Sequence, residues 1–222
     1  MQIIFWSAIL ALAIVLGMAV IVYHAVERLS TASTLFKGSH PPSESDDSDW
    51  SKAYAQADIW AKSQGLKPFD CLDFYGLIEE HPVHIGSWKH PTGAYYLVLY
   101  LFMEKTWFDI TSMLSTGGYV TTSNQRDALT LPETENTYLQ VFTDAPLLTL
   151  HQLHQEGLDY LCEQLKAQPV LSPLSLRNLM AQAMEKQTAS IKQQPLWYFG
   201  RRLWLNNKTV QQVYPQDLLT SA

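Results

Sequence analysis

The chain has 222 residues, 47% of them hydrophobic and 16% charged, and its formal net charge is −6. No overall excess of basic residues marks a nucleic-acid surface, so we expect no nucleic-acid partner. Cys71 and Cys162 lie in neither a CxxC nor a Cys/His zinc spacing, which predicts two reduced core residues rather than a disulfide or a zinc site.

The chain opens on a long apolar run. Residues 3–23 are 21 residues without a charged side chain, and a helix of that length spans roughly 30 Å, the thickness of the hydrocarbon core. Trp6 and Tyr23 lie near its two ends, where aromatic side chains favour the membrane interfaces. The run is longer than the apolar part of a signal peptide, and no Lys or Arg precedes it. We therefore predict a retained transmembrane anchor over residues 1–24.

Basic residues give this anchor a direction. Arg28 and Lys37 follow the run and none precedes it, so the positive-inside rule predicts a single-pass protein with its domain in the cytoplasm. Ala13 and Gly17 form a small-xxx-small pair, which would suit a homodimer or another membrane helix as partner.

A polar segment separates the anchor from the rest. Residues 38–50, GSHPPSESDDSDW, carry two prolines and four acidic residues, a composition typical of a solvated linker. We predict a juxtamembrane segment and acidic linker over residues 25–49 and one folded domain over residues 50–222, a length sufficient for a core of its own.

Hydrophobic periodicity predicts an α+β fold. Trp50, Tyr54, Ala57 and Ala61 recur at helical spacing before Gly65. Beyond residue 82 the period becomes that of strands, and Gly117-Gly118 predicts a hairpin. We expect an antiparallel meander of four to five strands within residues 83–142. Helices over residues 144–166 and 172–193 would flank the sheet.

Three histidines are the best candidates for chemistry. His151 and His154 are three residues apart on the apolar face of a predicted helix, where they could bind a metal or act as a base. His84, in the run EEHPVH at residues 79–84, could be a third ligand. The HExxH pattern of zinc proteases is absent, so we favour histidines that form hydrogen bonds inside the core.

A polar hairpin offers a second candidate. Asp109 and the Thr, Ser and Asn residues of the segments 111–112 and 121–124 could line a polar pocket, but solvent-facing strands are normally rich in such residues, and we favour that interpretation. No nucleophile elbow, dinucleotide fingerprint or P-loop is present, and we predict no cofactor.

The tail combines aromatic and basic residues. Residues 196–205, LWYFGRRLWL, place Trp197 and Trp204 around Arg201 and Arg202, the composition of a segment at a lipid interface. We favour the alternative in which the aromatic rings pack on the sheet while the arginines extend outward.

Together these features predict a single-pass, membrane-tethered interaction or regulatory module with no catalysis of its own. A variant of this prediction binds an amphiphile or a peptide on the aromatic-rich sheet. The alternative is a membrane-anchored, metal-dependent hydrolase that uses His151 and His154.

Overall fold

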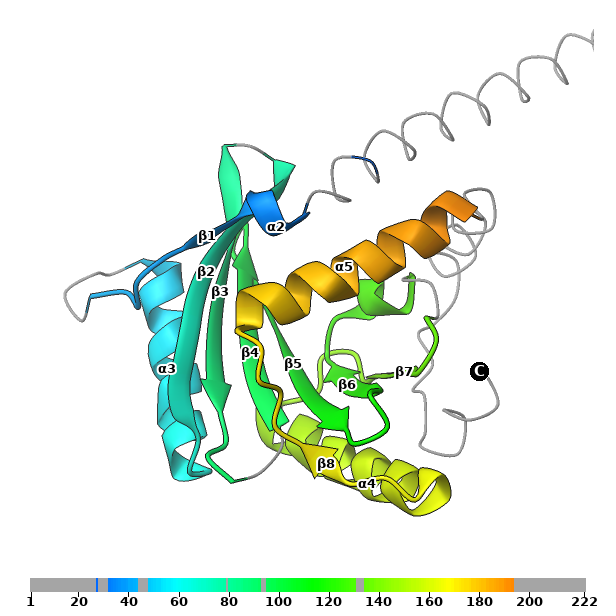
Figure 1. The fold of residues 1–222 in the computed structure, drawn as a ribbon. Helices are drawn as coiled ribbons and strands as arrows, with labels where there is room; N and C mark the ends of the chain where they lie inside the picture. Colours follow the sequence, from blue (N-terminus) through cyan, green and yellow to red (C-terminus); the bar gives the residue numbers. More distant parts are fainter. Residues whose placement is uncertain are drawn as a thin grey trace, which may run out of the picture.

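The computed structural model describes residue 27 and residues 32–43, 48–78, 80–92, 95–130 and 134–193 (Figure 1). These residues form one mostly antiparallel sheet with helices on both faces, which confirms the α+β class. The predicted anchor at residues 3–23 lies outside the described residues. Among those that are described, no helix is both long enough and apolar enough to cross a bilayer.

The elements follow in chain order. They are α2 (Ala32–Leu35), β1 (Phe36–Gly38), α3 (Asp49–Ser63), β2 (Lys67–Ile78), β3 (His81–Lys89), β4 (Tyr95–Phe102), β5 (Lys105–Leu114), β6 (Tyr119–Ser123), the 3-10 helix η1 (Arg126–Thr130), β7 (Thr137–Val141), α4 (Leu147–Leu165), β8 (Pro169–Val170) and α5 (Leu176–Gln193).

The strands lie in the order in which they occur in the chain. The described part of the sheet runs from β1 to β7, and β8 pairs with the end of β5, on the edge away from β6. Strands β3 to β6 form the expected antiparallel meander, and β1 and β2 extend it, but β7, the predicted fifth strand, pairs with β6 in parallel, with Tyr119 opposite Thr137. The segment that includes η1 returns the chain to the starting end of β6, as a parallel pair requires. The meander is therefore longer than predicted and its last strand has the opposite direction.

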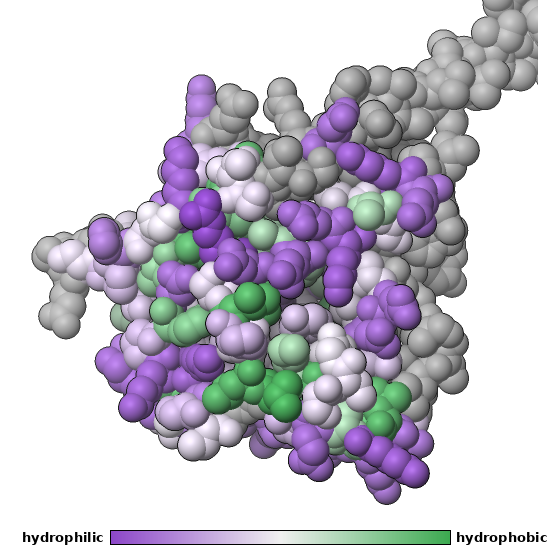
Figure 2. Space-filling view, in the orientation of Figure 1, coloured by the Kyte–Doolittle hydropathy of each residue, from purple (hydrophilic) through white to green (hydrophobic). Residues whose placement is uncertain are grey.

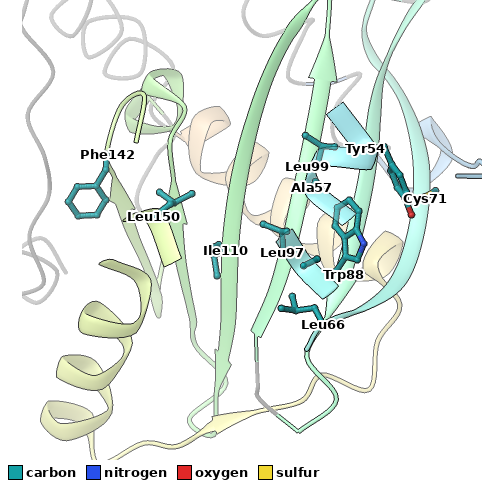
Figure 3. Packing of buried hydrophobic residues seen from close by; sticks show 11 residues of the cluster. Tyr54, Ala57, Leu66, Cys71, Trp88, Leu97, Leu99, Ile110, Phe142 and Leu150 are labelled. Carbon is teal, nitrogen blue, oxygen red and sulfur yellow. The ribbon is translucent and has the colours of Figure 1, made fainter. Parts of the chain in front are cut away.

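Helices α3 and α4 cover one face of the sheet. Figure 3 shows Trp88, Leu97 and Ile110, from three neighbouring strands, within the cluster of buried residues on this face. The ring of Tyr54 from α3 lies 4.9 Å from that of Trp88, and Trp88 Nε1 donates a hydrogen bond of 2.9 Å to Asp58 Oδ1. These contacts dock α3 with its aromatic side inward, as its sequence period predicted.

Helices α2 and α5 cover the other face. Leu176 and Ala181 of α5 belong to a cluster of buried residues with Ile85 and Val98 of the sheet. Figure 2 shows the outer side of α5 as mostly hydrophilic. Because both faces are covered, β4 is apolar on both sides, as the sequence of this strand indicated.

The folded part begins before residue 50. Strand β1 pairs with β2, with Lys37 opposite Asp73, and Phe36 is almost completely buried. Helix α2 is tied to α5 by a hydrogen bond of 2.6 Å from Arg177 Nη2 to the Ser33 carbonyl. Two short elements that the sequence placed in the juxtamembrane segment and linker thus belong to the layers of the domain.

Candidate functional sites

His154 is held between two strands beneath α4. Its Nε2 lies 2.9 Å from Ser112 Oγ of β5, and its Nδ1 lies 2.9 Å from Thr122 Oγ1 of β6. All three residues have no solvent-exposed surface. His154 lies on the apolar face of α4, which packs on the sheet. Ser112 and Thr122 lie on the face of the hairpin that α4 covers, so both hydroxyl groups point toward the imidazole ring.

The environment of His154 favours the neutral ring. Burial, and secondarily the charge of His151, lower the pKa of His154 to about 3. In the neutral ring one nitrogen donates and the other accepts, and a hydroxyl can act in either sense, so all three groups are satisfied. The network therefore has the properties of a structural element of the core, although a Ser–His distance of this kind also occurs in nucleophilic sites.

Gln140 of β7 belongs to the same polar layer. It is opposite Thr122 in the pairing of β6 with β7, it is fully buried, and its amide atoms have no hydrogen-bond partner among the described residues. Gly157 of α4 makes room for it, since a Cβ at that glycine would lie only 1.5 Å from Gln140 Nε2. The absence of a side chain at Gly157 thus sets how closely α4 approaches the sheet.

His151 lies in an aromatic cluster nearer the surface. Its ring centroid is 5.5 Å from that of Trp60 and 5.3 Å from that of Tyr95, and His90 stacks on Tyr95 at 5.3 Å. Burial and the charge of His90 lower the pKa of His151. Its Nε2 is shielded from solvent and has no hydrogen-bond partner in the described part of the chain. His151 thus has a buried ring nitrogen without a described partner, whereas both ring nitrogens of His154 are hydrogen-bonded.

His84 lies in a different place. Its Nδ1 is 2.8 Å from Asp73 Oδ1, directly across the β2–β3 pair, and Trp50 stacks on its ring at 5.5 Å. Within the residues that the structure describes, no three His, Cys, Asp or Glu side chains converge in a way that could hold a metal ion. The structure therefore places His151 and His154 on one helix and His84 in a separate contact with Asp73.

The sequence predicted that Asp109 faces solvent, but the structure shields its carboxyl group from solvent. Burial raises its pKa to about 6, although hydrogen bonds with Ser123 and Tyr100 act in the opposite direction. The Tyr100 ring stacks almost parallel on Trp107, with centroids 5.2 Å apart. Asp109 Oδ1 is shielded from solvent and has no partner among the described residues.

The polar hairpin is thus not a solvent-facing surface, and that prediction was wrong. Ser112, Thr122 and Ser123 are buried, and Thr111 bonds across to Thr121 at 3.1 Å. The hydroxyl groups of the hairpin form hydrogen bonds with His154 of α4 or with the neighbouring strand instead of with solvent. The many polar residues of the hairpin gave no sign that both of its faces would be covered.

Cys71 and Cys162 are free thiols, as predicted, and Cys71 is buried. The remaining candidates lie outside the described residues. They are Trp6, Ala13, Gly17, Tyr23, Arg28, Trp197, Arg201, Arg202 and Trp204.

Comparisons of the chain with protein-family models, with curated proteins and with solved structures gave no match.

Proposed function

We propose that the protein is a single-pass, membrane-tethered interaction or regulatory module without catalysis of its own, with its domain in the cytoplasm. The observation that carries the proposal is the uncharged run at residues 3–23, followed closely by a folded domain. Such a run is long enough to span a bilayer as a helix.

The environment of the histidines supports the non-catalytic part of the proposal. His154 uses both ring nitrogens inside the core, and His84 is paired with Asp73. A general base must reach the proton that it removes, and the burial of His154 gives a substrate no access to it. Exposed apolar side chains support a binding role, since Ile59 of α3 is 72% exposed and Leu148 of α4 is 56% exposed.

The tether is tested by expressing the full chain and extracting the membranes at alkaline pH. We expect the protein to stay with the lipid, and a C-terminal reporter to be active on the cytoplasmic side. A matched variant with Leu12→Arg and Ala13→Arg places two charges in the middle of the run, at a cost of about 5 kcal/mol or more, and should be released. If the unaltered chain is released equally, the tether is refuted.

The hydrolase alternative draws support from one atom, His151 Nε2, which has no hydrogen-bond partner among the described residues. Metal analysis of the purified full chain separates the two functions. One zinc ion per chain, lost in a folded His151→Ala variant, would replace the present proposal with the hydrolase. Absence of metal from the chain loaded with zinc and then dialysed would support the non-catalytic module.

A further inference from the structure

The chain joins the domain at one particular end of the sheet. Phe36, the first residue of β1, is opposite Phe74 of β2, which in turn is opposite Val83 near the start of β3. The chain therefore arrives at the end that carries the β2–β3 turn. His84 is opposite Leu101 near the end of β4, so the β4–β5 turn lies at this end as well (Figure 1). The β5–β6 turn, at Thr116 and Gly117, lies at the opposite end.

The tether between membrane and domain is short. Eight residues, 24–31, separate the apolar run from the start of α2 at Ala32. Even a fully extended segment of this length spans at most about 28 Å. The end of the sheet that receives the chain would therefore stay within about 28 Å of the bilayer surface, whereas the opposite end lies a strand length away from this point of attachment.

The surface of this end has an apolar tip. Met103 is 54% exposed, and it is held in the β4–β5 turn by left-handed backbone at Met103 itself (φ 47) and at Glu104 (φ 67). Leu35, Phe102 and Trp107 are half-buried residues at the rim of the cluster beneath α5. Methionine is flexible and polarizable, and a Trp side chain suits the boundary between apolar and polar surroundings.

Charge at this end is nearly balanced. The exposed charged and titratable groups described here include Lys37, Glu80, His81, Glu104, Lys105, Arg177, which bonds to α2, and Glu27 of the tether. Because acidic and basic groups offset each other, electrostatic attraction to anionic lipid supplies little of the contact. An apolar contact with the headgroup region is the interaction that this composition favours.

We infer that the end of the domain formed by α2 and the β2–β3 and β4–β5 turns lies against the same bilayer that holds the anchor, with Met103 inserted at the level of the headgroups. The inference rests on the proposed tether, and it adds a defined orientation. The α3 and α4 surfaces, with exposed Ile59 and Leu148, then extend along the side of the domain and stay accessible to a partner.

The test uses the full chain in phosphatidylcholine nanodiscs that contain a nickel-chelating lipid. A spin label is placed at Met103→Cys or, as a matched control, at Thr116→Cys in the exposed turn at the opposite end. Both are made in a Cys162→Ser background that retains the buried Cys71. We expect the nickel lipid to relax the label at 103 at least several-fold more than the label at 116, and the ratio to be the same when anionic lipid is added.

Three outcomes would overturn the inference and can be told apart. A chain that is retained in the nanodisc, but whose two labels respond alike, refutes the orientation and leaves the tether intact. A chain that does not enter the nanodisc refutes the tether and the orientation together. Stronger relaxation at 116 would show that the domain is inverted.

Discussion

Replacement of Asp109 by Asn should stabilise the protein at neutral pH. The pKa of the carboxyl rises from 3.8 to about 6 on folding, so the folded state holds a proton that the unfolded state has already released. Stability contributed by this group is therefore complete below about pH 4 and is lost as the pH rises to about 6. A shift of two pKa units corresponds to about 3 kcal/mol. Asn is uncharged and nearly the same size, so Asp109→Asn should recover most of that amount at pH 7.

His154 has the opposite pH dependence. Its pKa falls to about 3, so the unfolded state gains a proton below about pH 6.5 that the folded state refuses until about pH 3. Stability from this group is lost as the pH falls through that window, by about 1.4 kcal/mol per pH unit. The two slopes offset each other between about pH 4 and pH 6. Together these two groups should contribute little pH dependence there, whereas removal of one of them in Asp109→Asn should make stability fall by about 3 kcal/mol more from pH 6 to pH 4 than in the unaltered protein.

Urea unfolding of the full chain in detergent, followed by tryptophan fluorescence at several pH values, measures both effects. Asp159→Asn, an exposed carboxylate on α4, is the matched control and should change stability by less than about 0.5 kcal/mol. The reasoning is refuted if Asp109→Asn shifts the free energy of unfolding equally at pH 4 and pH 7, or if it destabilises the protein at pH 7.

Three further predictions concern the core and one helix end. Gly157→Ala places a methyl group against Gln140 and should lower the free energy of unfolding in urea by about 1–3 kcal/mol or more. A Cβ at Gly38 would meet nothing within 4 Å, so the control Gly38→Ala should cost less than about 1 kcal/mol. Equal effects of the two substitutions would contradict the close approach of α4 to the sheet. His154→Ala strands two buried hydroxyls and should lower the unfolding free energy by about 3 kcal/mol or more; a neutral result would show that the network is absent. Ser48→Ala removes the side chain that accepts from Ser51 N at the start of α3 and should cost about 1 kcal/mol by thermal unfolding, with no loss expected if α3 begins elsewhere.

Local sequence patterns were sufficient to predict a helix or strand whose buried residues recur at the regular spacing of that element. The aromatic period at Trp50 and Tyr54 located α3, and the continuous apolar residues of β4 indicated a strand covered on both faces. Gly117, with a φ of 86°, lies in the turn where the glycine pair predicted a hairpin. In each case the signal comes from residues that are neighbours along the chain.

Features that depend on distant segments were not predictable in this way. Strand β2 has shifts in register near Pro68 and after Phe74. Such shifts interrupt the alternation of inward and outward side chains, so the sequence did not predict this strand. Strand β1 has only three residues, and its burial depends on α5, which begins about 140 residues later. The raised pKa of Asp109 likewise results from tertiary burial that the alternation of β5 does not encode.

The position of Phe36 has a practical consequence for the definition of the domain. A soluble fragment cut at residue 50, where the linker was predicted to end, would lack this ring, which lies 4.8 Å from that of Phe74. Deletion of a buried phenylalanine typically costs about 3–5 kcal/mol, a large part of the stability of a domain this size. The segment that precedes α3 therefore completes the core as well as connecting it to the apolar run at residues 3–23. Proteolytic cleavage between α2 and α3 would weaken the α5 side of the sheet first and leave the packing beneath α3 and α4 in place.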